Sequence, residues 1–230
     1  MQSLDGKLSV EYTISQAGTA SSSTPEAGDD DTILGTPAKN EIFYTSTNGK
    51  VVEPYKTEAF GGAIVSNTYA NGVGVIVFDR EITEIGDSAF YDCDGLTKIN
   101  TGSVEYIGTY AFYDCVSLVN VTIPAKLSFV GDYAFYNCQT MSSIYIPKDV
   151  KSIGEKALYN CAGHLIIDAN QPDYDYARSP FHNSQFKKVT FGDNIETVGA
   201  NFMTDCLKLK EVVLGKNLKS LSGSAFFRSE

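Results

Sequence analysis

Few side chains in this sequence could bind a metal or act as nucleophiles: its 230 residues include five cysteines and two histidines. Cys161 and His164 stand in "CAGH", which has the C-x-x-H spacing of half a zinc site. The sequence offers no second pair of this kind. His164 also falls at a leucine position of the repeat described below, so the favoured interpretation is structural. His182 falls at a tyrosine position, and we interpret it as a surface residue.

The remaining chemical motifs are weak. Three consecutive acids, Asp29, Asp30 and Asp31, could bind calcium, but carboxylates in a flexible segment more often carry solvated charge. The sequence contains no H-E-x-x-H helix, no G-x-S-x-G elbow and no phosphate-binding loop. We therefore predict that the protein is not an enzyme and that it has no catalytic residues, metal or cofactor.

Charge and hydropathy narrow the classes of partner. The formal net charge is −10, which disfavours nucleic acid and anionic membranes as partners. No run of eighteen apolar residues is present, so we expect no membrane insertion by this segment. The first residues lack the pattern of a signal peptide, which is expected of a cytosolic protein or of a mature form whose signal has been removed.

The cysteines mark an internal repeat. Cys93, Cys115, Cys138 and Cys161 follow one another at steps of 22, 23 and 23 residues, and Cys206 comes 45 residues later. Two serines extend the series at the same spacing, Ser184 and Ser229. The positions predict about seven turns of one unit of about 23 residues, the last of them incomplete.

One unit, residues 118–138, reads "LVNVTIPAKLSFVGDYAFYNC". Val121 and Ile123 alternate with polar residues as in a half-buried strand, and Pro124 ends that strand because it lacks an N–H group. Gly131 suggests a tight turn or a close approach between coils, and Phe135 supplies a large core group. A single unit cannot bury its apolar face alone, so the fold predicted is a β-rich solenoid with short, parallel, in-register strands.

The repeat resembles the BspA-like class of leucine-rich repeats. The resemblance rests on "IGDSAFYDC", "IGTYAFYDC", "VGDYAFYNC" and "IGEKALYNC", with "VTIP" and "IYIP" as strands, and it covers roughly residues 79–230. The preceding residues 44–79 resemble the segment that often precedes such repeats in secreted proteins of anaerobic gut bacteria. The resemblance implies a protein that is secreted or exposed at the cell surface, and several members of this class act as adhesins.

The chain divides into three parts. Residues 1–40 hold a possible strand, "KLSVEYTI", and a segment rich in Ser, Thr, Gly and Asp that we interpret as a flexible linker. Residues 41–78 hold "EIFYTST", "KVVEPY" and "GVGVIVF", interpreted as strands of an N-terminal β cap. Residues 79–230 form the solenoid. The unit around residues 163–184 has lost its Ile-Gly pair and its cysteine, so its coil geometry cannot be inferred from the other repeats.

The repeated cysteine allows two interpretations. Equivalent positions in successive coils lie about 4.8 Å apart, which favours a ladder of buried free thiols acting as small apolar groups. The alternative is two disulfide bridges, Cys93–Cys115 and Cys138–Cys161, with Cys206 left unpaired between two serines.

Aromatic residues gather at outward positions of the repeats that end at Cys115 and Cys138. They occupy three columns and form the predicted binding site: Tyr106, Tyr110, Tyr113, Phe129, Tyr133 and Tyr136. Part of this signal is ordinary repeat packing, because Tyr91 and Tyr159 share the column of Tyr113. A patch of six rings would nevertheless be large, and large apolar patches tend to mark contact sites.

We therefore expect a non-catalytic adhesion or ligand-binding scaffold of a bacterial surface or secreted protein. The expected partner is a host or neighbouring-cell surface protein or a glycan. The alternative is a structural spacer that presents another domain of a longer chain. The sequence shows no cap after the last repeat, which suggests end-to-end self-association at that edge.

Overall fold

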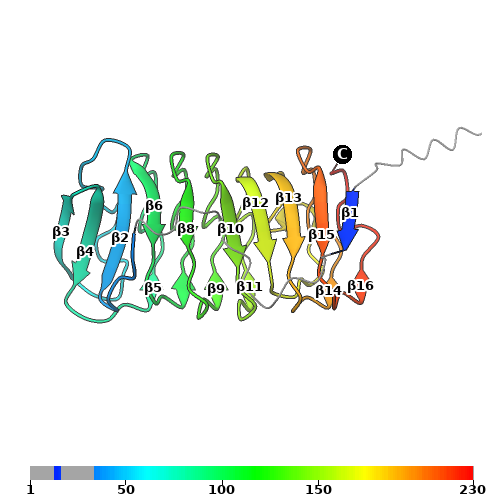
Figure 1. Ribbon diagram of the computed structural model, residues 1–230, viewed down its shortest axis with the longest axis horizontal. Helices are drawn as coiled ribbons and strands as arrows, with labels where there is room; N and C mark the ends of the chain where they lie inside the picture. Colours follow the sequence, from blue (N-terminus) through cyan, green and yellow to red (C-terminus); the bar gives the residue numbers. More distant parts are fainter. Residues whose placement is uncertain (1–12, 17–33, 230) are drawn as a thin grey trace, which may run out of the picture.

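Two rows of short parallel strands run along the axis of an elongated solenoid (Figure 1). It is seen in a computed structural model that describes residues 13–16 and 34–229. The first row consists of β6 (Leu96–Asn100), β8 (Asn120–Thr122), β10 (Ser143–Ile146), β12 (Ala162–Ile167), β13 (Gln185–Phe191) and β15 (Glu211–Leu214). The second row consists of β5 (Glu84–Ile85), β7 (Tyr106–Ile107), β9 (Phe129–Val130), β11 (Ser152–Ile153), β14 (Thr197–Val198) and β16 (Ser220–Leu221).

The strands of successive repeats are parallel and in register, as the sequence predicts. Lys98 of β6 lies opposite Asn120 of β8. The next repeat is joined by a 2.9 Å hydrogen bond from the Ser142 N–H, just before β10, to the Val119 carbonyl, just before β8. Six repeats contribute a strand to the first row in the described residues. The seven units counted in the sequence therefore make about six turns.

The apolar positions of the repeat form one continuous core between the rows. Val121, Leu127 and Val130 are buried, and so are Phe112 and Phe135, which confirms that both phenylalanines are core residues. Their rings stack at 5.1 Å between centroids, and Phe90 continues the same column. Each coil therefore buries its apolar face against its neighbours.

Glycine is required where adjacent coils touch. A Cβ atom on Gly131 would lie 2.5 Å from the backbone carbon of Gly108 in the preceding repeat. No side chain fits at that distance, which confirms the close approach predicted for this position. The glycine column therefore sets how tightly the coils pack.

Three antiparallel strands extend the first row before β6, in the order β3 (Ile64–Ala70), β4 (Val73–Phe78), β2 (Glu41–Ser46). The strand expected at residues 50–55 does not form, because β4 and β6 already occupy both edges of β2. Val52 instead donates its N–H to the Tyr44 hydroxyl and accepts a hydrogen bond from Asn67. That these strands protect the end of the solenoid stays a prediction.

The edge of the sheet at β15 is covered, contrary to expectation. Strand β1 (Thr13–Gln16) pairs with β15 in parallel, so a segment from the beginning of the chain lies beside the last first-row strand (Figure 1). The first-row edge expected to be open is therefore occupied by β1, and self-association of the chain stays a prediction. The expected strand at residues 7–14 falls mostly outside the described residues, and so do residues 17–33.

The repeat without an Ile-Gly pair has its own geometry. Its second-row strand shrinks to one bridge between Gln171 and Val198, and a 3-10 helix follows at Tyr176–Arg178. The coil still returns to the common path, because Phe181 and Ser184 are buried at the positions of the core phenylalanine and the cysteine. The irregular residues thus bulge from a preserved core.

Candidate binding surface

The six predicted aromatic residues are all accessible to solvent, and none is buried. Tyr113 and Tyr136 directly follow the core residues Phe112 and Phe135 in a turn. The N–H of Tyr113 bonds the carbonyl of Tyr110 within that turn. The turn reverses the chain, so the residue after each buried phenylalanine faces outward.

Stacked tyrosines from four repeats form a continuous row, which we call the tyrosine row. The row consists of Tyr91, Tyr113, Tyr136 and Tyr159, with ring centroids 5.0, 4.8 and 4.6 Å apart. Beside it, Tyr110 and Tyr133 stack on each other at 5.2 Å. Each ring of the tyrosine row directly follows a buried core residue of its own repeat, so the spacing between rings follows the spacing between coils.

The two sets of rings are steeply inclined to each other. The planes of Tyr110 and Tyr113 differ by 72°, although each ring is nearly parallel to its own stacking neighbour. Both sets therefore cannot lie perpendicular to the solenoid axis. At least one set overlaps like roof tiles and leaves part of each ring face uncovered.

These tyrosines line an open depression of about 320 Å³, here called the tyrosine pocket. Its lining residues are Tyr110, Tyr113, Tyr133, Tyr136, Lys156 and Tyr159. Lys156 stands in the next repeat at the position that Tyr110 and Tyr133 hold in theirs. The pocket therefore combines aromatic faces, phenol hydroxyls and one ammonium group.

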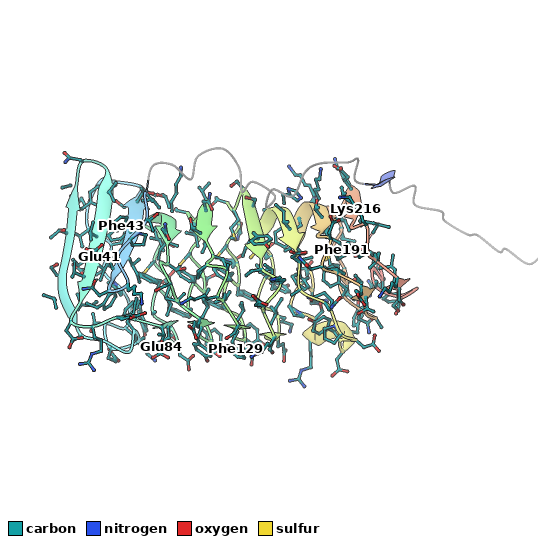
Figure 2. All side chains as sticks on the ribbon, turned by 60° about the horizontal axis from the view of Figure 1, so that its bottom comes forward. Glu41, Phe43, Glu84, Phe129, Phe191 and Lys216 are labelled. Atoms are coloured by element: carbon teal, nitrogen blue, oxygen red, sulfur yellow. The ribbon has the colours of Figure 1, made fainter. Side chains whose placement is uncertain are left out.

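Tyr106 and Phe129 form a separate aromatic pair on the second row. Their rings stack at 4.7 Å, and no ring contact in the described part of the chain joins them to the tyrosine pocket. Figure 2 shows Phe129 on the same long side of the molecule as Glu84. The six predicted residues therefore form separate ring stacks, and Tyr106 and Phe129 do not line the tyrosine pocket.

Three phenols of the pocket, those of Tyr113, Tyr133 and Tyr136, have a raised pKa, and burial is the largest cause in each. Burial, followed by the carboxylate of Glu155, raises the pKa of Tyr133, whose hydroxyl donates to that carboxylate at 3.2 Å. Arg178 donates to the other oxygen of Glu155 at 2.8 Å. Burial also raises the pKa of Tyr113. At neutral pH these hydroxyls can donate as well as accept hydrogen bonds.

Tyr110 and Tyr133 occupy a strained backbone position. Their φ angles are +58° and +56°, in the left-handed region that costs an ordinary L-residue roughly 1–2 kcal/mol. Asn201, in the same column, shows a residue type that adopts this conformation more readily. Ser88 and Lys156 hold the same position with φ angles of +61° and +51°, so the left-handed conformation belongs to the repeat and is not particular to the tyrosines.

Sequence reasoning left several residues of this surface outside the predicted site. Tyr91 and Tyr159 continue the tyrosine row, and Lys156 lines the pocket. The exposed ring of Tyr55 extends the row beyond Tyr91, at 5.4 Å. The column after the core phenylalanine was a sufficient signal for two of them, whereas Tyr55 lies outside the repeat.

The possible zinc half-site does not assemble. The thiol of Cys161 donates to the carbonyl of Phe135 at 2.8 Å, whereas the ring of His164 hydrogen-bonds Thr190 on the outer face of β12. His164 does not take the inward leucine position, because it lies opposite Ser143 of β10 and the inward pair is formed by Ile144 and Leu165. No group of three or more His, Cys, Asp or Glu suited to a metal occurs among the described residues, and Asp29 to Asp31 lie outside them.

His182 lies at the end of the tyrosine row. Its ring is 6.0 Å from that of Tyr159 and hydrogen-bonds the Thr204 hydroxyl at 2.8 Å. Burial lowers its pKa, so the neutral form is favoured. This contact set gives the histidine a structural role on a partly exposed face.

All five cysteines are free and buried, in agreement with the first interpretation of the thiol ladder. The thiol of Cys115 donates to the carbonyl of Phe90 in the preceding repeat at 3.0 Å, and the hydroxyl of Ser229 makes the same bond to Met203. Serine can thus replace cysteine because either side chain supplies this hydrogen bond. Burial raises the pKa of Cys206 to about 11, which leaves its thiol unreactive.

Over the described ranges, no helix has the length and apolarity needed to cross a bilayer.

The match to a protein-family model agrees with the repeat architecture. A family model of the BspA type leucine rich repeat region matches residues 62–173 and 174–230, in six copies. A solved leucine-rich repeat protein from Bacteroides ovatus ATCC 8483 is 14% identical, with a TM-score of 0.29, and the match covers 71% of each chain. No curated protein is significantly similar to the chain.

Proposed function

The chain belongs to the BspA type leucine rich repeat family, and from that membership we propose that it is an adhesion or ligand-binding scaffold of a bacterial surface or secreted protein. Repeats of this family are generally non-catalytic and serve as protein-binding scaffolds. BspA-type proteins are typically surface-exposed or secreted in bacteria. The adhesive role, the location and the ligand of this chain are the parts that we propose.

The observation that supports binding most directly is the tyrosine pocket. It brings five tyrosines from three adjacent repeats to one accessible depression. Tyrosine combines a large apolar face with a hydrogen-bonding tip at low cost in conformational entropy. Such residues are enriched among those that dominate binding energy at interfaces.

The proposed ligand is a host or neighbouring-cell surface protein or a glycan. Tilted rings leave partial faces for a sugar ring or an apolar side chain, while the hydroxyls and the Lys156 ammonium offer hydrogen bonds. The net charge of −10 disfavours polyanionic partners over most of the surface.

The test is a protein and glycan array probed with the intact chain and two double variants. Tyr113→Ala/Tyr136→Ala removes the centre of the tyrosine row. The matched control, Tyr106→Ala/Phe129→Ala, removes two stacked rings from the same two repeats but outside the pocket. The proposal predicts hits that persist in the control and disappear in the first variant. Hits lost equally in both variants, or an absence of hits with the intact chain, would contradict it.

A further inference from the structure

Strand β1 takes the place of a repeat strand although it lies far from the repeats in sequence. Four consecutive residues pair with β15 in the parallel direction that the repeats use. The register sets Ile14 opposite Val212, which is the buried residue of β15. Ile14 thus continues at the register position of the inward column that runs through the repeats: Ile99, Val121, Ile144, Leu165, Val189 and Val212.

Part of the β15 backbone does not bond β13, and its N–H and carbonyl groups are directed toward β1. The N–H of Lys210 donates to the carbonyl of Lys187 on the β13 side at 2.9 Å. Because backbone groups alternate in direction along a strand, Glu211 and Val213 direct theirs toward β1. An edge of this kind is a template for any extended segment with apolar residues at alternate positions.

We propose that the outer edge of β15 is a strand-binding site for an extended polypeptide. Its intramolecular occupant is β1, and its ligand in trans is the same segment of a second copy of this chain. The occupant is the segment "TISQ", whose backbone register sets Ile14 opposite Val212 and whose direction matches the repeats. This site is separate from the tyrosine pocket and does not rest on the proposed function.

Connection within one chain explains why β1 of the same copy, and not that of a second copy, occupies the edge. Gly35 accepts a hydrogen bond from Asn100 of β6, which lies six strand positions from β1, a span of about 29 Å at the usual strand spacing. The 18 residue steps from Gln16 to Leu34 can extend to roughly 60 Å. In general, partners linked in one chain meet at an effective concentration on the order of 1 mM. A second copy at micromolar concentration therefore cannot compete unless the resident strand is disabled.

Two complementary full-length variants test the site. The acceptor variant, Ile14→Pro/Ser15→Pro, prevents β1 from pairing with β15 in its own chain. The donor variant, Val213→Pro, keeps β1 intact and blocks the β15 edge, because the backbone groups of Val213 face β1 and not β13. If β1 occupies its site more than nine-tenths of the time, the dissociation constant in trans is about 0.1 mM or lower. Sedimentation at about 0.3 mM should then show heterodimers in the mixture, and monomers for each variant alone.

The control carries all three substitutions, and mixed with the acceptor it should stay monomeric. If Val213→Pro lowers the melting temperature, the donor variant is not used. A synthetic peptide of residues 7–18 is then titrated into the acceptor variant. Saturable binding of this peptide, weakened in the intact chain by its own strand, is the result expected. Monomers in the mixture together with no peptide binding would overturn the proposal. Self-association of the acceptor that neither donor nor peptide changes would also overturn it.

Discussion

Truncating one core ring should weaken the whole solenoid. The Phe135 side chain is fully buried and stacks on Phe112 at 5.1 Å, so Phe135→Ala leaves a cavity between coils. Substitutions of this kind cost about 3–5 kcal/mol. For a chain of this size, each 1 kcal/mol lowers the melting temperature by roughly 2–4 °C, so we expect a fall of roughly 6–20 °C.

Phe129→Ala is the matched control, because its ring is only partly buried and stacks on Tyr106. An aromatic pair adds about 0.5–1.5 kcal/mol beyond its buried area, so its loss should be clearly smaller. The assay is thermal unfolding by far-ultraviolet circular dichroism, with hydrogen exchange to locate the coils that open first. In a stack of repeats, the defect should uncouple the coils on either side. Equal melting temperatures for the two variants would refute the assignment of Phe135 as a shared core contact.

Three further outcomes follow from the same contacts. Denatured, unreduced protein should titrate five free thiols, since all five cysteines are free, and a count of one would instead indicate two disulfides. Gly131→Ala should lower the free energy of unfolding by about 1–3 kcal/mol or more, because its Cβ would meet backbone at 2.5 Å. Gly223→Ala, with open space around it, should change that free energy by less than about 0.5 kcal/mol. Equal effects in urea unfolding would contradict the close packing of coils. The free energy of unfolding should fall as the pH drops below about 6.5. Burial lowers the pKa of His164 from that value in the folded protein, so the unfolded chain binds the proton first. A His164→Gln variant with an unchanged pH slope would exclude this cause.

The repeat made most of the fold predictable from the sequence. Its period places one strand of each row per coil, and the buried positions of Leu127, Val130 and Phe135 follow directly from the pattern. Two features of the fold could not be predicted, because a local sequence pattern does not show which distant segments pair. Residues 50–55 look like a strand but find both edges of β2 occupied, and β1 reaches β15 across almost the whole chain.

The candidate site was predictable only in part, for a related reason. Periodicity identifies which residues share a column, so the stacking of Tyr113 on Tyr136 could be anticipated. It does not give the angle between columns, so it could not show that Tyr106 and Phe129 form a stack of their own that does not line the tyrosine pocket. The backbone strain at Tyr110 and Tyr133 likewise became visible only from the φ angles.

A calorimetric comparison of dissociation constants shows whether the tyrosine pocket binds the ligand. With a protein or glycan found on the array, Tyr113→Ala/Tyr136→Ala should weaken binding by at least about 30-fold, since residues that dominate an interface contribute about 2 kcal/mol or more. Tyr106→Ala/Phe129→Ala should stay within about threefold of the intact chain, because its rings lie outside the pocket. A ligand that binds the first variant as tightly as the intact chain would contradict the account.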